Sequence, residues 1–335
     1  MKFTYGSDFE MMIRNRNYRK PEKKSGFFTS SNFVSYSSGI APKPPVEAKK
    51  VVHEYEPVCG KLGGTKKEPL QIPNAPAGYL YQEDGVSAEF NTPICESVPD
   101  LISSIRQAQA YARALVPAKM GADYEPHGIS AAWFDASVLE QYPQANVIGC
   151  DPDFQAWEQG AERQVPEIET FGGFRFAGFH IHVGYDLAIF PPWMMAGCLD
   201  LYLADYADPT CMTRADYYPR GIFRPKPYGV EYRALGSSWL NYLDSVEDKL
   251  TRWEHDMQKD WGDVLNRMFA FMDERLEQQR ERAQRVFGDP QPVEDFEDDP
   301  EDGELFEGDE VGVDWAEAGD DWADELGNDA AENGR

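Results

Sequence analysis

The spacing of apolar residues predicts a first helix that begins at about residue 97. Residues 97–118 read SVPDLISSIRQAQAYARALVPA, and their apolar positions repeat at the 3.6-residue period of a helix. The face predicted to be buried consists of Leu101, Ile105, Ala108, Ala112 and Leu115. Ser97 is suited to cap the start of this helix, and Pro117 is predicted to end it.

Two further regions are also typical of helices. Residues 192–207 read PWMMAGCLDLYLADYA and predict an apolar helix opened by prolines. Residues 239–287 predict one or two long helices that end at Gly288.

Strand-like segments lie between the helices. They are residues 2–12, 79–91, 145–150, 172–185 and 228–236. Strands and helices alternate irregularly, without a regular βαβ repeat or a glycine-rich turn between strand and helix. This order disfavours a doubly wound nucleotide-binding fold and predicts an α+β protein with a largely antiparallel sheet.

Four of these strands each carry a pair of polar residues at positions i and i+2, which point to the same face of a strand. The pairs are Asp8 and Glu10, Glu89 and Asn91, His180 and His182, and Glu231 and Arg233, with apolar residues on the opposite face. Each pair alone is more often structural. Carboxylates gathered on one face repel one another unless a cation lies among them. Mg²⁺ and Mn²⁺ prefer carboxylate oxygens, and Mn²⁺ also accepts imidazole, so the four pairs together indicate a metal site.

An arginine-rich stretch precedes the last of these pairs. It contains Arg214, Arg220, Arg224 and Lys226, and Arg233 follows. Guanidinium groups bind phosphate and carboxylate oxygens through paired hydrogen bonds. For Arg214 and Arg220, a solvated loop is an equally good interpretation. Metal, carboxylates and arginines together are the groups that phosphoryl transfer from a nucleotide requires.

The charge is distributed unevenly. Residues 288–335 hold 20 acidic residues and one arginine, within a total net charge of −27. A segment so charged and so poor in apolar residues is predicted to be disordered. Trp315, Trp322 and Leu326 are spaced to form a short helix that docks a protein partner, and a solubilising tail is the alternative. We therefore expect a catalytic domain over residues 1–287 and an acidic tail over 288–335.

The remaining sequence is only mildly acidic, and it lacks a face typical of nucleic-acid binding. Residues 14–50 carry nine Lys and Arg against two Glu, which predicts a basic loop insertion over about 14–69. The N-terminus lacks secretory-signal features, and no run approaches the roughly 18–20 apolar residues of a membrane span. Five scattered cysteines favour reduced thiols. We therefore expect a cytoplasmic protein with no membrane partner.

The sequence resembles the phage-type branch of the COOH–NH2 ligases (amidoligases), relatives of glutamine synthetase and glutamate–cysteine ligase. The resembling stretches run in family order over residues 5 to about 240, and they are YGSDFEMMI, CGKLGGTKKEPL, QEDGVSAEFNTP, IGCDPDFQAW, FRFAGFHIHVG and FRPKPYGVEYRALGSSWL. The resemblance implies a curved, glutamine synthetase-like antiparallel sheet lined by metal ligands, with helices on its outer face. It implies ATP at one end of the sheet and the acceptor carboxylate at the other.

The resemblance also implies roles for individual residues. The implied ligands of Mg²⁺ or Mn²⁺ are Asp8, Glu10, Glu89, His180 and Glu231. The implied contacts of ATP are His182, Arg224 and Arg233, with both arginines near the transferring phosphate. The family has two glutamates in its first strand, so Asp8 is a departure that shifts or loosens the metal.

Two loop motifs also match the family, but their roles stay open. In Gly63-Gly64-Thr65-Lys66, Lys66 is a candidate contact of a nucleotide phosphate or a substrate carboxylate, and a tight turn is the alternative. In Cys150-Asp151-Pro152-Asp153, a structural turn is the simpler interpretation, and a substrate-binding acid is the other.

The predicted function is ATP-dependent ligation of a carboxylate to an amine of a peptide, protein or small molecule, by an enzyme of phage origin acting in the host cytoplasm. The carboxylate attacks the γ-phosphate of ATP to give an acyl phosphate, and the amine then displaces phosphate. Arg224 and Arg233 hold the phosphoryl group, and Glu89 or Asp153 deprotonates the amine. Glu231→Ala is expected to abolish turnover and leave the fold intact. The alternatives are a metal-dependent hydrolase and a non-catalytic phage assembly or interaction protein with a ligase-like fold.

Overall fold

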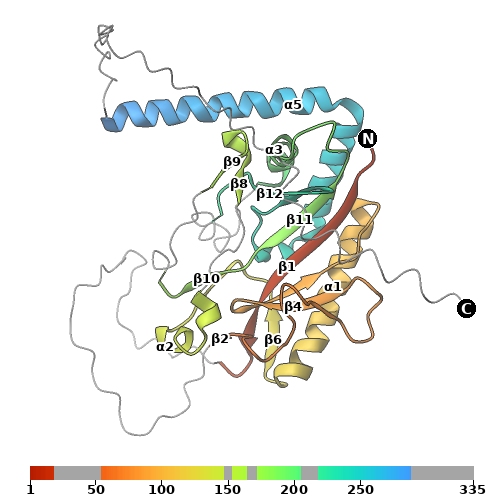
Figure 1. Ribbon diagram of the computed structural model, residues 1–335, viewed down its shortest axis with the longest axis vertical. Helices are drawn as coiled ribbons and strands as arrows, with labels where there is room; N and C mark the ends of the chain where they lie inside the picture. Colours follow the sequence, from red (N-terminus) through yellow and green to blue (C-terminus); the bar gives the residue numbers. More distant parts are fainter. Residues whose placement is uncertain (19–53, 147–152, 164–171, 205–217, 288–335) are drawn as a thin grey trace, which may run out of the picture.

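The structure is a computed structural model that describes residues 1–18, 54–146, 153–163, 172–204 and 218–287. Its central element is the long strand β1 (Thr4–Asn15), which crosses the middle of the main sheet (Figure 1). In the first part of β1, buried residues alternate with half-buried ones, so that Phe9 is fully buried between the partly accessible Asp8 and Glu10. The predicted alternation therefore positions β1 with one apolar and one polar face.

In the described residues the main sheet has 11 strands, and every strand pair is antiparallel. In spatial order the strands are β3 (Leu70–Gln71), β4 (Leu80–Asp84), β5 (Ser87–Asn91), β1, β11 (Phe179–Gly184), β13 (Gly229–Tyr232), β12 (Ile222–Lys226), β8 (Phe154–Gln155) and β9 (Ala161–Glu162). The strands β2 (Tyr55–Glu56) and β6 (Tyr124–His127) pair with the C-terminal part of β1. A separate two-stranded sheet contains β7 (Ala131–Trp133) and β10 (Phe174–Phe176). The predicted α+β class with a largely antiparallel sheet is confirmed.

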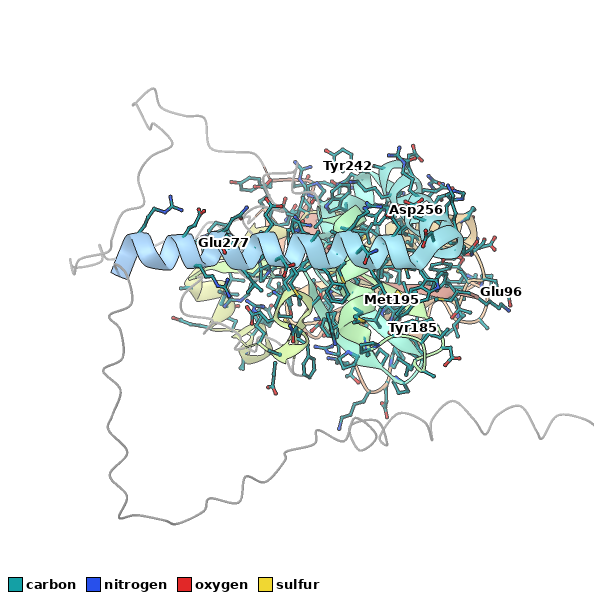
Figure 2. The ribbon with its side chains drawn as sticks, turned by 90° about the horizontal axis from the view of Figure 1, so that it is seen from above. Glu96, Tyr185, Met195, Tyr242, Asp256 and Glu277 are labelled. Atoms are coloured by element: carbon teal, nitrogen blue, oxygen red, sulfur yellow. The ribbon has the colours of Figure 1, made fainter. Side chains whose placement is uncertain are left out.

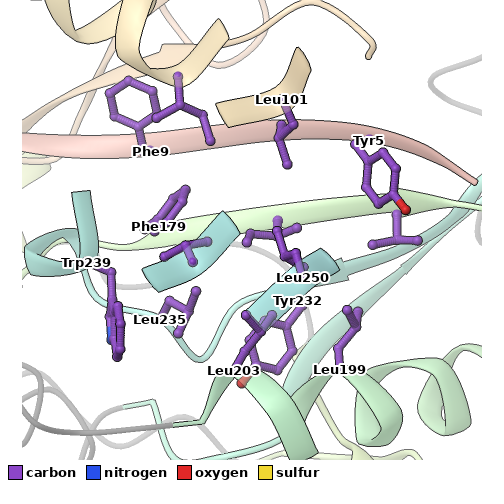
Figure 3. Packing of buried hydrophobic residues seen from close by; sticks show 14 of the residues in the cluster. Tyr5, Phe9, Leu101, Phe179, Leu199, Leu203, Tyr232, Leu235, Trp239 and Leu250 are labelled. Atoms are coloured by element: carbon purple, nitrogen blue, oxygen red, sulfur yellow. The ribbon is translucent and has the colours of Figure 1, made fainter. Parts of the chain in front are cut away.

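The long helices are α1 (Val98–Met120), α3 (Pro192–Leu203) and α5 (Leu243–Phe287), and the short ones are α2 (Ala136–Leu139) and the 3₁₀ turns η1 (Pro143–Asn146), η2 (Ala156–Glu158) and η4 (Ser237–Asn241). The helices α1 and α3 pack on the apolar face of the sheet, and Figure 3 shows Leu101, Leu199 and Leu203 of these helices beside the strands. Each fully buried Phe or Leu side chain contributes about 1.5–3 kcal/mol. This face therefore holds the helices and the sheet together.

The helix α1 begins as predicted but ends later. Ser97 accepts a hydrogen bond from the Asp100 N–H at 3.2 Å, and all five residues of the predicted apolar face are buried. The prediction that Pro117 ends the helix is wrong, because α1 continues to Met120. In the last turn Pro117 removes only one hydrogen bond, and the buried Leu115 and Val116 keep this turn packed. Gly121, with φ of 115°, ends the helix instead.

One other predicted element differs from the structure, and one strand beside β13 was not predicted. The strand predicted over 145–150 is wrong in its described part, because Pro143–Asn146 forms the 3₁₀ turn η1. This turn buries Ala145 against Phe134 and Val138, which an extended chain would not do. The strand β12 was not predicted, although it pairs along its length with β13.

The helices predicted at 192–207 and 239–287 correspond to α3 and α5, except that residues 239–241 belong to the 3₁₀ turn η4 and α5 begins at Leu243. Inside α5, Asp260 has non-helical φ and ψ of −156° and 78°, and its side chain accepts a hydrogen bond from the Asp263 N–H at 3.1 Å. Asp260 thus separates two helical halves and caps the second. Figure 2 shows this second half running straight past Glu277 and beyond the body of the protein.

Several predictions lie outside the described residues: most of the basic insertion, Arg214, Cys150 to Pro152, and the acidic tail with Trp315, Trp322 and Leu326. In the part that is described, no helix combines the length and apolar composition needed to cross a bilayer.

Candidate functional site

The register of the central strands brings the predicted site residues together. Asp8 of β1 lies opposite His180 of β11 on one side and opposite Asn91 of β5 on the other. Glu10 lies opposite Glu89. Directly opposed residues point to the same face of a sheet, so these side chains share one face while Phe9 points to the other.

A second row crosses the next strands in the same way. His182 of β11 lies opposite Glu231 of β13, and Glu231 lies opposite Arg224 of β12. Arg233 follows Glu231 by two residues and so points the same way. Nine residues, those of the four strand pairs and Arg224 of β12, therefore lie on one face of five adjacent strands, which we call the polar face; they are Asp8, Glu10, Glu89, Asn91, His180, His182, Arg224, Glu231 and Arg233.

The first group on the polar face is the histidine cluster, which we define as Asp8, His182 and Glu231. One ligand atom from each lies within 4.8 Å of the others. His182 Nε2 is 3.4 Å from Asp8 Oδ1. The neighbouring His180 places its Nδ1 2.8 Å from Asp8 Oδ1 and 3.5 Å from Glu231 Oε1. The cluster thus offers two carboxylates and one imidazole to a cation, with the imidazole of His180 beside them.

The second group is the carboxylate cluster, which we define as Glu10, Asp84 and Glu89. Its ligand oxygens also lie within 4.8 Å of one another. Glu10 Oε2 accepts a hydrogen bond from the Gly178 N–H at 2.8 Å, which fixes the direction of this carboxylate. Asp84 ends β4, beside the hairpin turn at Gly85. Because Glu10 and Asp8 are two residues apart on one strand, the two clusters are neighbours.

Positive side chains surround Glu231. Lys226 Nζ lies 2.9 Å and Arg224 Nη1 3.9 Å from Glu231 Oε2, and Arg233 Nη1 donates to Glu231 Oε1. Asp153, only 1% exposed, lies 3.1 Å from Arg224 Nη2 and 3.2 Å from Arg233 Nε. Both guanidinium groups are thus held between two buried carboxylates, which fixes their orientation on the polar face.

The two clusters ionise differently. Burial, reinforced by the negative charges of Asp8 and Asp84, raises the pKa of Glu89 well above its usual range. Burial also opposes ionisation of Glu231, but Arg233 holds the pKa of Glu231 well below its usual range. Burial likewise opposes ionisation of Asp8, but His180 and His182 outweigh it and hold the pKa of Asp8 well below its usual range.

The burial of His180 also affects its own ionisation. Burial and the charge of Arg233 lower the pKa of His180, so that near neutral pH the imidazole is uncharged.

The donor set fits a hard divalent cation. Asp8 Oδ1 and Asn91 Oδ1 are both buried, and within the described residues neither accepts a well-directed hydrogen bond, although His180 Nδ1 is close to the former. Two buried acceptors at directly opposed positions need a cation or a donor between them. Carboxylate and amide oxygens with imidazole nitrogens are ligands that Mn²⁺ accepts, and the oxygens suit Mg²⁺.

Lys66 does not belong to either cluster. It is exposed in the turn that follows Gly63 and Gly64. The carboxylate of Glu83 accepts hydrogen bonds from the backbone N–H groups of Gly60, Leu62 and Gly63 at 2.7, 2.8 and 2.7 Å. These N–H groups are therefore occupied by Glu83, which favours a structural role for this glycine loop.

Arg220 is part of a buried anchor on the opposite face. Asp200 of α3, fully buried, accepts hydrogen bonds from Arg220 Nε at 2.9 Å and from the Gly221 N–H at 2.7 Å. It also accepts from the Tyr232 hydroxyl at 2.7 Å and Trp157 Nε1 at 3.0 Å. Arg220 is thus neither a solvated loop residue nor part of the polar face.

Sequence reasoning missed Asp84 and Tyr228, and it gave Asp153 a different role. Asp84 precedes a glycine turn, where acids are common, so its sequence context carried no special signal. Asp153 had been considered as a base or a substrate contact, but its partners are Arg224 and Arg233, which are about 70–80 residues away in the chain. Tyr228 contacts His182, and the signal that was available is its position in the turn before Glu231.

Searches of protein-family models, of curated proteins and of solved structures found no match to this chain. The resemblance to amidoligases and the glutamine synthetase-like form of the sheet therefore stay predictions.

Proposed function

We propose that this chain is an ATP-dependent ligase that joins a carboxylate to an amine through an acyl phosphate. The observation that supports this most is the pair of adjacent cation clusters on one face of the sheet, flanked by two buried arginines whose guanidinium groups are held in place. Phosphoryl transfer needs cations and guanidinium groups in this combination.

In this proposal the histidine cluster and the carboxylate cluster hold Mg²⁺ or Mn²⁺. When bound, such ions neutralise charge on phosphate oxygens and orient the phosphate chain. Arg224 and Arg233 hold the phosphoryl group as it moves from ATP to the acceptor carboxylate. Each guanidinium contacts two different carboxylates, those of Asp153 and Glu231, through one nitrogen each, and a planar guanidinium can also bind a phosphate edge through two nitrogens.

The proposal needs a base that takes a proton from the attacking amine. Asp153 suits this role poorly, because Arg224 and Arg233 both contact its Oδ1. Glu89 suits it better, because the charges that act on it are those of acids and not of arginines, and the carboxylate oxygen that does not bind the cation can accept the proton. We therefore assign the proton transfer to Glu89.

The experiment measures ATP binding by calorimetry with and without Mn²⁺, in the wild type and in Arg233→Lys. This variant keeps the charge and loses the planar fork, so we expect Mn²⁺-dependent ATP binding in the wild type and at least about tenfold weaker binding in the variant. The control is Arg252→Lys, an exposed arginine paired with Asp248 on α5. It should bind as the wild type does.

The same measurement separates the ligase from its rivals. A wild type that binds Mn²⁺ but shows no Mn²⁺-dependent ATP binding would favour the metal-dependent hydrolase. A wild type that binds neither would favour the non-catalytic interaction protein.

A further inference from the structure

The hydroxyl of Tyr228 makes a short contact with the histidine cluster. Tyr228 Oη lies 2.5 Å from His182 Nδ1, and the two rings are tilted by 34° with centroids 6.1 Å apart. The contact joins the turn between β12 and β13 to the neighbouring strand β11. It occupies one of the two nitrogens of His182.

The backbone holds Tyr228 in this position. Its carbonyl oxygen accepts a hydrogen bond from the Tyr185 N–H at 2.9 Å, at the end of β11. The next residue, Gly229, has φ of 150°, and a Cβ atom there would lie 2.1 Å from the Val183 carbonyl oxygen. Only glycine lets the turn come this close to β11. The phenol is therefore presented to His182 by a turn that has little freedom to move.

The other nitrogen of His182 faces the carboxylates. Nε2 lies 3.4 Å from Asp8 Oδ1, and His182 belongs with Asp8 and Glu231 to one set of ligand atoms. An imidazole binds a metal through an unprotonated nitrogen, and its other N–H is then usually donated to an oxygen acceptor. A phenol oxygen is such an acceptor.

We propose that Tyr228 is a positioning residue that accepts the Nδ1–H of His182 and so presents the unprotonated Nε2 as a metal ligand beside Asp8 and Glu231. The opposite tautomer would direct an N–H at the cation. This inference rests on the proposed function, because it assumes that the histidine cluster holds a cation. It differs from the role implied by the resemblance, in which His182 contacts the nucleotide.

The test uses the full chain, Mn²⁺ alone as the probe, and the variant Tyr228→Phe, which keeps the ring and removes the hydroxyl. Loss of a partner that orients a metal-bound histidine typically weakens metal binding by about 10–100-fold, and we expect a loss in this range. Tyr242→Phe is the matched control, because Tyr242 is similarly exposed, at 53% against 47% for Tyr228. It should bind Mn²⁺ as the wild type does.

A second readout reports the tautomer directly. NMR correlation of the histidine ring nitrogens in the metal-free protein should show His182, assigned with His182→Gln, protonated at Nδ1. In Tyr228→Phe the same ring should become a mixture of tautomers. A merely structural role for Tyr228 would not move this signal.

The outcomes separate the inference from the proposed function. A wild type that binds Mn²⁺ with the same affinity as Tyr228→Phe, or a His182 ring protonated at Nε2, overturns the inference alone. A wild type that binds no Mn²⁺ overturns the proposed function and the inference with it.

Discussion

The histidine cluster and the carboxylate cluster lie side by side on one face of the sheet, yet they handle their negative charge in different ways. In the histidine cluster, Lys226 and Arg233 contact Glu231, and two imidazoles lie beside Asp8. In the carboxylate cluster, the strongest charges acting on Glu89 are those of other acids. The first is compensated by the protein itself. The second needs a proton or a cation.

The difference predicts two kinds of cation site. A cation that binds the histidine cluster competes with Lys226 and Arg233 for the oxygens of Glu231, which lowers its affinity. The affinity rises when these positive side chains move toward another anion, such as phosphate. A cation that binds the carboxylate cluster displaces a proton and relieves repulsion between buried acids. We therefore expect Mn²⁺ alone to bind both clusters, the carboxylate cluster more tightly, and nucleotide to strengthen its binding at the histidine cluster.

The largest expected effect comes from breaking the compensated cluster. Glu231→Gln should destabilise the metal-free protein by about 3–5 kcal/mol, because the buried Arg233 and the partly buried Lys226 lose a carboxylate partner. Urea unfolding at neutral pH measures this loss. The earlier expectation that removing the Glu231 carboxylate leaves the fold intact is therefore replaced by a large loss of stability.

The control for this variant is Glu125→Gln, which removes a half-exposed partner of Arg16 at 3.0 Å. Surface ion pairs contribute about 0–1 kcal/mol, so this change should be small. Equal losses in the two variants would contradict the compensation of charge around Glu231.

The second effect concerns the uncompensated cluster. Glu89→Gln removes a ligand and should weaken Mn²⁺ binding by at least the roughly tenfold cost seen for groups that only orient ligands. In the absence of metal the same variant should be as stable as the wild type or more stable, because a buried carboxylate among like charges is lost. Calorimetry with Mn²⁺ and urea unfolding in chelator measure the two results. Lower metal-free stability would show that Glu89 is compensated after all.

The third effect is on pH dependence. Folding raises the pKa of Glu89 above the value of about 4.3 for a free glutamate, so the folded state binds this proton more tightly. The contribution of Glu89 to stability is then greatest below about pH 4.3 and is lost as the pH rises toward the raised folded-state pKa. The stability advantage of Glu89→Gln should grow with pH in this window, as urea unfolding in chelator would record. Parallel curves for the two proteins would contradict it.

The contribution of Asp8 and Glu231 to stability changes with pH in the opposite direction. Their folded-state pKa values are lowered, so they stabilise the protein above the unfolded-state values and lose this contribution as the pH falls. A fall in pH should therefore reduce the contribution of the histidine cluster to stability and reduce the charge repulsion within the carboxylate cluster.

The smallest expected effect belongs to Asp84→Asn. Asp84 is exposed, so water screens its charge better than that of the buried Glu89. Mn²⁺ affinity should fall by less than in Glu89→Gln, and stability should change by about 0.5 kcal/mol or less. If the two variants lost the same affinity, both carboxylates would have to bind the ion equally.

The polar face could be predicted from the sequence because a strand repeats every two residues. Spacing alone predicts a shared face for the pairs Asp8 and Glu10, and His180 and His182. The order β5, β1, β11, β13, β12 could not be read from spacing, and this order brings the pairs together. Contacts such as those of Asp153 with two arginines depend on the order of the strands, so no local sequence pattern predicts them.

The helices show where local signals suffice and where they fail. The apolar face of α1 and its cap at Ser97 follow from period and propensity. Pro117 is a strong local signal for a helix end, but the burial of Leu115 and Val116 on the sheet outweighs it. The prediction of a strand at η1 is wrong because the conformation of this turn depends on the hydrophobic cluster that buries Ala145, which lies outside the local sequence.

The anchor at Asp200 has a consequence for motion. The Asp200 carboxylate on α3 accepts a hydrogen bond from Tyr232, which lies between Glu231 and Arg233 in the chain. It also accepts one from the backbone N–H of Gly221, just before β12. Sliding α3 across the sheet would rupture all of these hydrogen bonds at once. The helix and the two strands should therefore move as one rigid unit, and any opening or closing of the polar face would have to hinge elsewhere.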